Sequence, residues 1–238
     1  MSDVLLSIKN VSNSYTSNKY GIFGKREDKK VLDNVSLEIH RGEIFGLAGR
    51  SGSGKTTLGR CILGLAGYSG EIILDNVLLN KKNGRISRRE TAMKLGAVFQ
   101  DPGSALNPVK KIGWLLEEPL VIHKLGGRKE REKLTDEMLY LIGLDPSFKN
   151  RRPSELSSGQ KQRVSIGCAL MLKPLLLIAD EPVSALDAST GAQIVNLFRD
   201  LNQTLGLSML FISHNSGLVN FLCDRAAFME SGVLGPWR

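Results

Sequence analysis

The sequence contains no long apolar segment and few cysteines. Its longest strongly apolar stretch, Ala169 to Ala179, is interrupted by a lysine and a proline and is shorter than the roughly 20 residues that a transmembrane helix needs. The N-terminus lacks the basic start, apolar core and small-residue cleavage site of a secretory signal. The three cysteines, Cys61, Cys168 and Cys223, form neither a metal-binding spacing nor a disulfide framework. These absences predict a cytosolic protein with reduced thiols and no segment that crosses a membrane.

Internal repeats and low-complexity tracts are also absent, and the composition is that of an ordinary globular protein. Apolar residues make up 42% of the 238 positions and charged residues 24%, so disorder is excluded for the chain as a whole. The net charge of +8 is compatible with an anionic partner. Because acids are interleaved in each basic cluster, we interpret the excess as solvated surface and expect no nucleic-acid partner. A nearby cytoplasmic membrane leaflet is the second interpretation.

Short apolar segments alternate with longer segments of helical periodicity. This pattern is typical of a parallel sheet with crossover helices. The strand pattern lapses between Gln100 and Leu172, which predicts a helical insertion into an otherwise α/β domain. The predicted strands are Val4–Ile8, Val35–Ile39, Ile44–Ala48, Ile72–Leu74, Ala97–Phe99, Leu175–Ala179, Met209–Ile212 and Ala226–Met229, and the clearest predicted helices are Thr56–Leu65, Lys129–Ile142 and Thr190–Leu205.

Two of these helical segments carry an apolar stripe along one face. Each stripe is expected to pack against the core. In the first segment the stripe consists of Leu134, Met138, Leu141 and Ile142, and in the second it consists of Ile194, Leu197, Phe198, Leu201 and Leu205.

The segment after the third predicted strand has the spacing of a phosphate-binding loop, a glycine and four residues before Gly-Lys-Thr. Glycines let the backbone curl so that several N–H groups point at one phosphate, and the following helix adds the positive end of its dipole. Lys55 would reach the β- and γ-phosphates, and the Thr56 hydroxyl would coordinate Mg²⁺. The expected nucleotide contacts are Gly49, Arg50, Ser51, Gly52, Ser53, Gly54, Lys55, Thr56 and Thr57.

Two acids, Asp180 and Glu181, directly follow the apolar segment Leu175–Ala179. The carboxyl ends of parallel strands are where α/β proteins hold their ligands. Asp180 is predicted to hold Mg²⁺ through water, and Glu181 to polarise the attacking water. Solvated acids at a strand end are the ordinary alternative, and the phosphate loop upstream makes the chemical interpretation stronger. The pair favours hydrolysis over mere binding.

Small residues open a predicted helix at Ser157, Ser158, Gly159 and Gln160. Such a helix start exposes backbone N–H groups and can form a second anion site, although by itself it is an ordinary helix cap. One chain cannot easily direct both sites at the same phosphate. A dimer is therefore predicted.

Taken together, these motifs resemble those of the ABC ATPases, and the resemblance covers essentially the whole chain. Residues 156–160 are similar to the LSGGQ signature, which lies between the phosphate loop and the acid pair in that family. Gln100 is similar to the Q-loop glutamine that links Mg²⁺ to the helical subdomain, and His214 to the switch histidine that contacts the γ-phosphate. Asp187 lies in a segment similar to the D-loop. Tyr15 is placed like the aromatic residue that stacks on adenine.

The resemblance implies a P-loop NTPase (RecA-like) core with an N-terminal antiparallel β subdomain and an inserted α-helical subdomain. The whole of 1–238 would be one ABC ATPase domain, with the helical subdomain at about 101–171. Two ATP molecules would lie in a head-to-tail dimer, each between the phosphate loop of one subunit and the signature of the other. Residues 98–108 and 178–187 are most similar to the ATPases of oligopeptide, dipeptide and nickel importers.

Membership of that group would give the chain defined partners and a defined location. It would hydrolyse ATP at the cytoplasmic face of the membrane to power the import of peptides or nickel chelates. Transmembrane permease subunits would dock near Gln100 to Trp114, and a solute-binding protein would take part indirectly. A second ATP-binding subunit is expected, as a heterodimer because such importers often pair two different ATPases, with a homodimer as the alternative.

Four features depart from the family pattern. Ser158 stands where glycine is usual, Cys168 where arginine is usual, and Asn215 replaces the acid after His214. The sequence also ends at Arg238, before the C-terminal tail typical of peptide importers. These departures raise the alternative of a weakly active regulatory subunit in a mixed dimer.

Two further alternatives have less support. An ABC ATPase that acts on nucleic acid or the ribosome usually carries a long coiled-coil insert, a zinc module or a second cassette, and the sequence shows none of these. A GTP-binding switch protein needs Asn-Lys-x-Asp, and the nearest match, Asn80 to Asn83, lacks the acid.

Overall fold

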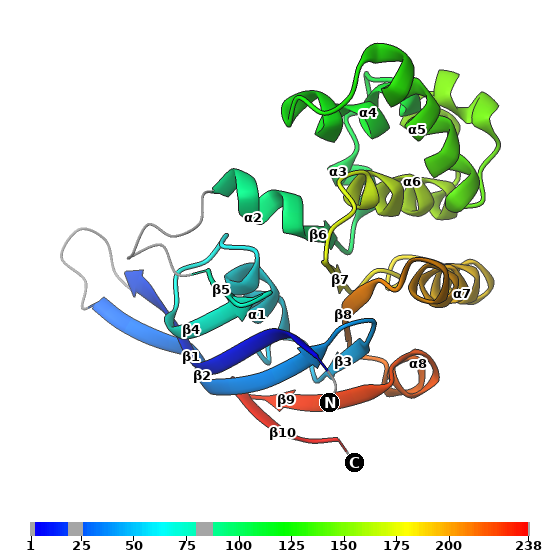
Figure 1. The fold of residues 1–238 in the computed structure, drawn as a ribbon. Helices are drawn as coiled ribbons and strands as arrows, with labels where there is room; N and C mark the ends of the chain where they lie inside the picture. Colours follow the sequence, from blue (N-terminus) through cyan, green and yellow to red (C-terminus); the bar gives the residue numbers. More distant parts are fainter. Residues whose placement is uncertain (1–2, 19–25, 80–87, 238) are drawn as a thin grey trace. The chain divides into compact units, whose positions relative to one another are not determined.

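The computed structural model describes residues 3–18, 26–79 and 88–237, and the chain divides into two compact units (Figure 1). The first unit contains the chain up to Thr91 together with the part from Leu210 onward, and the second unit is Ala92–Met209. Asn80 to Asn83 and Arg238 lie outside the described residues.

A four-stranded antiparallel sheet in the order β2-β1-β4-β5 forms part of the first unit. Alternation of apolar and polar residues buries Leu6, Ile8 and Ile39 on one side. β1 and β2 pair along 15 residues each, with several register shifts, so both are longer than the predicted strands. The bounds are β1 Val4–Asn18, β2 Arg26–His40, β4 Ser69–Leu74 and β5 Val77–Leu78.

The same unit also contains strands in the order β10-β9-β3-β8, in which β3 and β9 are parallel and β9 and β10 antiparallel. β3 and β8 are buried along their whole length, as expected for apolar strands covered on both faces. β8 carries the chain from the second unit into the first. The bounds are β3 Ile44–Ala48, α1 Lys55–Ile62, β8 Ser208–Ser213, α8 Ser216–Leu222, β9 Arg225–Glu230 and β10 Val233–Pro236.

The second unit is mostly helical and contains one parallel strand pair, β6 with β7. Helix α6 packs against α3, α4, α5 and α7. Among the described residues no strand occurs between β6 and β7, which confirms the predicted helical stretch. The bounds are α2 Arg88–Lys94 (which enters this unit from the first), β6 Leu95–Val98, α3 Pro102–Ala105, α4 Ile112–Ile122, α5 Arg128–Leu141, the 3₁₀ helices Pro146–Asn150 (η2) and Pro153–Glu155 (η3), α6 Ser158–Leu170, β7 Leu176–Asp180 and α7 Ala188–Leu205.

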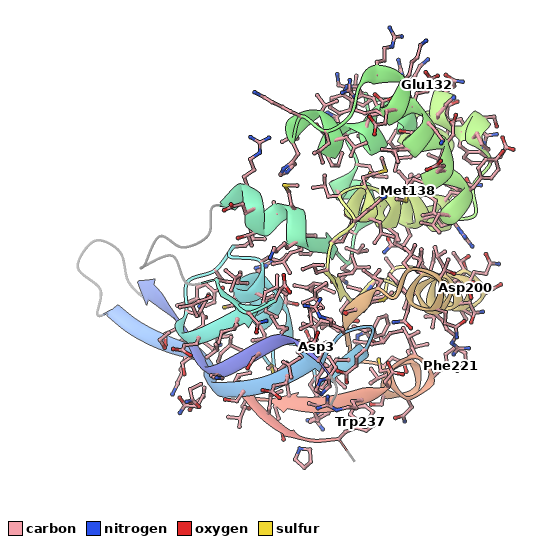
Figure 2. All side chains as sticks on the ribbon, viewed as in Figure 1. Asp3, Glu132, Met138, Asp200, Phe221 and Trp237 are labelled. Atoms are coloured by element: carbon pink, nitrogen blue, oxygen red, sulfur yellow. The ribbon has the colours of Figure 1, made fainter. Side chains whose placement is uncertain are left out.

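The apolar stripe of α5 differs from the predicted one. Thr135, Leu139 and Ile142 are buried, whereas the other three predicted positions are half-buried. Met138, one of those three, points from α5 towards α6, where a Cβ added at Gly167 would lie 3.3 Å from its Cγ (Figure 2). The physical reason is that α5 contacts α4, α6 and η2 together, so several neighbours set its inward face.

The stripe of α7 follows the prediction except at its end. Ile194, Leu197, Phe198 and Leu201 are buried, but Leu205 in the last turn is 49% exposed, so that part of the prediction was wrong. Across the ranges that the structure describes, no helix combines the length and the apolar character that crossing a bilayer requires.

Candidate functional site

Three glycines shape the loop that joins β3 to α1. Gly49, Gly52 and Gly54 have φ values of 155°, 78° and 110°. A Cβ added at Gly49 would lie 2.2 Å from the Met229 carbonyl oxygen, and one at Gly54 would lie 2.9 Å from the Val31 carbonyl oxygen. Only glycine therefore fits these two positions. Gly54 is the N-cap of α1, and the first turn of that helix contains no acid that would repel an anion.

Two polar side chains are buried inside this loop. The Lys55 ammonium donates hydrogen bonds to the carbonyl oxygens of Gly49 (2.8 Å) and Arg50 (3.0 Å), and the side chain is only 5% exposed. The Ser53 hydroxyl is buried and has no hydrogen-bond partner among the described residues. Gly52 faces open space, since an added Cβ would meet no atom within 4 Å. Curled backbone, a buried cation and an unpartnered hydroxyl form a cradle that suits phosphate.

The other predicted contacts of the first unit lie around this loop in the sequence. Arg50 and Ser51 are exposed, and Thr56 and Thr57 are half-buried in the first turn of α1. Tyr15, on β1, is 46% exposed, so its ring is accessible to a ligand. His214 follows β8 directly and is exposed.

Asn215 has a structural role next to His214. Its Oδ1 accepts a hydrogen bond from the Leu218 N–H at 3.2 Å and caps α8. Asparagine is as good an N-cap as aspartate. The departure from the usual acid therefore keeps the helix start and removes only a negative charge beside His214.

In the second unit the two predicted acids lie at the end of β7. Asp180 is the last residue of this buried strand and is 7% exposed. Glu181 follows with φ 50°, a left-handed conformation that is uncommon for a non-glycine residue. Its carbonyl oxygen accepts hydrogen bonds from the N–H of Ser184 (3.2 Å) and from the Ser184 hydroxyl (3.0 Å). The turn thus fixes the backbone of Glu181.

Gln100 and Asp187 lie at other element ends of the same unit. Gln100 is exposed and comes two residues after β6. Asp187 is the N-cap of α7, where its carboxylate accepts from the Thr190 N–H (2.9 Å) and hydroxyl (2.7 Å). These hydrogen bonds lower the pKa of the Asp187 carboxyl.

The signature-like segment begins α6 with a capping box. The Ser157 hydroxyl accepts from the Gln160 N–H (3.3 Å), and the Gln160 side chain accepts from the Ser157 N–H (3.0 Å). Gly159 is buried, and a Cβ added there would lie 2.4 Å from Cγ2 of Thr190 at the start of α7. Ser158 is exposed and is not among the residues with positive φ, so the departure from glycine causes no backbone strain.

Cys168 replaces an arginine on α6 and packs against α4. Its thiol lies 3.5 Å from the Leu115 carbonyl oxygen, to which it donates. Pro119, four residues further along α4, has no N–H for that carbonyl, so the thiol contacts a group that the helix leaves unpaired. Burial raises the pKa of Cys168 and Cys223 to about 12 and that of Cys61 to about 11.

One contact of the phosphate loop was missed at the sequence level. The N–H of Gly232, in the turn between β9 and β10, donates to the Ser53 carbonyl oxygen at 2.9 Å. The two residues are far apart in the sequence. The only local signal is the pair Ser231-Gly232, which indicates a turn but no partner for it.

Comparison with known proteins gives consistent matches. A family model described as ABC transporter matches residues 32–184. The oligopeptide transport ATP-binding protein of Streptococcus mutans is 43% identical over 232 residues, which cover 97% of this chain and 73% of that protein.

Two solved structures share the fold. A dimeric ATP-binding cassette in a post-hydrolysis state, bound to ADP and Pi, has a TM-score of 0.81 and 32% identity, and the match covers 97% of this chain and 96% of that one. The protein cbiO1 of Clostridium perfringens, part of an ABC transporter complex, has a TM-score of 0.83 and 26% identity over 98% and 87% of the two chains. These similarities confirm the predicted fold class.

Proposed function

The chain belongs to the ABC transporter family, and from this premise we propose that it hydrolyses ATP to power an importer of peptides. The observation that carries the proposal is the glycine loop between β3 and α1, with the buried ammonium of Lys55 and the unpartnered hydroxyl of Ser53. Peptides are favoured over nickel chelates as the imported solute because the relative from Streptococcus mutans is named for oligopeptide transport.

In this proposal the first unit binds the nucleotide. The loop from Gly49 to Thr57 supplies backbone N–H groups to the phosphates, and Lys55 supplies a positive charge to the β- and γ-phosphates. The exposed ring of Tyr15 stacks on adenine. An adenine platform on a strand is consistent with ATP rather than GTP as the substrate.

Hydrolysis needs a water, a base and a stabilised γ-phosphate. Glu181 accepts a proton from the water while the water oxygen bonds to the γ-phosphorus, and the bond from that phosphorus to the β–γ bridging oxygen breaks to give ADP and phosphate. His214 contacts the γ-phosphate and holds its geometry. The fixed backbone of Glu181 supports this role because it limits where the carboxylate can point.

Mg²⁺ fits the oxygen donors of Thr56, Gln100 and Asp180. A hydroxyl, an amide oxygen and one carboxylate are ligands that Mg²⁺ accepts together with water and phosphate oxygens. When bound, the ion would neutralise phosphate charge. The described residues contain no cluster of three or more His, Cys, Asp or Glu side chains suited to a metal, which is consistent with an ion that the nucleotide helps to hold.

The proposal places the chain in a larger assembly at the cytoplasmic face of the membrane. The segment Ser157 to Gln160 and Asp187 face the ATP of a second ATP-binding subunit, in a heterodimer as the first expectation and a homodimer as the second. Permease subunits dock near Gln100 to Trp114, where Val109 (70%) and Trp114 (41%) expose apolar surface. We also propose that 1–238 is one ABC ATPase domain and that about 101–171, which contains α3 to α6, is its helical subdomain.

The decisive variant is Glu181→Gln. We expect it to bind ATP with parental affinity and to lose at least about a hundredfold in kcat, because the amide cannot accept the proton. With Mg-ATP it should also accumulate as a dimer, measured by size-exclusion chromatography with light scattering. Hydrolysis at near the parental rate would show that Glu181 is not the base.

Lys55→Ala is the companion variant for binding. Loss of the ammonium should weaken ATP binding by at least about tenfold in a calorimetric titration, because a charged hydrogen bond to phosphate is lost. GTP added as a competitor tests the base preference in the same assay. Unchanged affinity for ATP in Lys55→Ala would contradict the assignment of the loop.

A further inference from the structure

The phosphate loop is held from outside by a second turn of the first unit. Gly232, between β9 and β10, is buried and has φ 82°. Its N–H donates to the carbonyl oxygen of Ser53 at 2.9 Å, and its own carbonyl oxygen accepts from the Asp33 N–H at 2.9 Å. One residue thus connects the loop, the β9–β10 turn and strand β2.

The surroundings of Gly232 leave no room for any other residue. A Cβ added there would lie 2.4 Å from the carbonyl oxygen of Val31. The same oxygen lies 2.9 Å from a Cβ added at Gly54. Between the pairs Asn13–Leu32 and Ser14–Lys30 the register of β1 and β2 shifts by one residue, which puts Val31 in a β-bulge. The bulge therefore lies against both glycines.

The bond from Gly232 has a directional consequence inside the loop. The Ser53 carbonyl and the Gly54 N–H belong to one planar trans peptide, in which the two groups point in opposite directions. Because the carbonyl points at the β9–β10 turn, the Gly54 N–H points away from that turn. The hydrogen bond thus fixes the direction of a backbone donor that the sequence pattern assigns to phosphate.

We propose that Gly232 is a positioning residue for ATP hydrolysis: it sets the loop in its phosphate-binding form by holding the Ser53 carbonyl away from the nucleotide. The proposal rests on the proposed function, because it concerns the same loop. It adds a residue outside every motif that the sequence showed, and it assigns the β9–β10 turn to the nucleotide site.

The first test compares Gly232→Ala with Gly64→Ala. Both glycines have left-handed φ (82° and 68°), but a Cβ at Gly64 meets no atom within 4 Å, so this variant controls for backbone strain. Affinity for a non-hydrolysable ATP analogue is measured by calorimetry at a temperature where circular dichroism shows both variants folded. We expect the dissociation constant to rise about tenfold in Gly232→Ala and to stay within about twofold in Gly64→Ala. Equal affinity in the parent and both variants overturns the proposal.

A second test uses the parental chain and holds even if Gly232→Ala does not fold. If the turn favours nucleotide binding, nucleotide must in return stabilise the turn by the same factor. Amide hydrogen exchange at Gly232 should therefore slow about tenfold when the analogue saturates the protein. Unchanged exchange at Gly232 beside newly protected loop amides overturns the positioning role alone, whereas a parent that binds no analogue overturns the proposed function and the positioning role together.

Discussion

Glu181 holds a left-handed backbone at the point where the proposed chemistry takes place. This conformation costs an L-residue about 1–2 kcal/mol, and the two hydrogen bonds from Ser184 to the Glu181 carbonyl offset part of it. Strained residues of this kind cluster at functional sites because the surrounding structure must impose them. The acid pair itself was predictable from an apolar strand that ends in Asp180 and Glu181. The strain was not, because it arises from the turn that Ser184 closes.

Asp187 provides a pH-dependent test at the same scale. Hydrogen bonds from Thr190 hold the folded pKa of the Asp187 carboxyl below its ordinary value of 3.8. The ionised group therefore adds stability above the ordinary pKa, and this stability is lost as the pH falls through the lowered folded value. Asp187→Asn keeps a capping oxygen and removes only the charge.

We expect Asp187→Asn to have a lower urea midpoint than the parent at neutral pH, and the two midpoints to converge as the pH drops below 3.8. Urea titrations over this range measure the effect. A gap that stays constant down to the acid limit would mean that packing, rather than charge, makes the difference.

At the scale of elements, the contact between the starts of α6 and α7 depends on one missing methyl group. Gly159→Ala would place a Cβ 2.4 Å from Cγ2 of Thr190, and such overpacking costs about 1–3 kcal/mol of unfolding free energy. The second change Thr190→Ser removes that methyl and keeps the hydroxyl, so the double variant should recover most of the loss. Chemical denaturation of the three proteins measures both effects.

Gly191→Ala on α7 is the matched control. A Cβ there would lie 3.7 Å from the Val183 Cβ, an ordinary contact, and alanine favours a helix over glycine by about 1 kcal/mol. The control should be neutral or stabilising. Equal destabilisation by Gly159→Ala and Gly191→Ala would show that helix α6 does not need the close approach to Thr190.

The sequence predicted elements well where one strong local pattern determines them. The buried strands β3, β7 and β8 were found because their apolar runs are continuous. Helix α4 was not predicted, since Pro119 lies in its interior and normally indicates a helix end. The full length of β1 and β2 also stayed hidden, because polar residues there pair across strands without an apolar alternation.

At the scale of the whole molecule, the order of the motifs along the chain predicted the family before any geometry was known. The phosphate loop, the signature-like segment and the acid pair each have ordinary alternatives, but their joint order has few. What the order could not predict is the support of the loop, because Gly232 and Val31 reach it only after the chain has folded. The absence of a nucleic-acid partner remains a prediction.

The buried thiols make the chain convenient for fluorescence work. Thiolate, not thiol, attacks maleimides, and pKa values of about 11 for Cys61 and about 12 for Cys168 and Cys223 leave almost no thiolate at neutral pH. In Tyr140→Cys, whose site is 69% exposed, mass spectrometry should find one dye per chain, at residue 140; equal labelling of the native thiols would contradict this. Optical probes could then follow subunit motion without first stripping the protein of its own sulfhydryls.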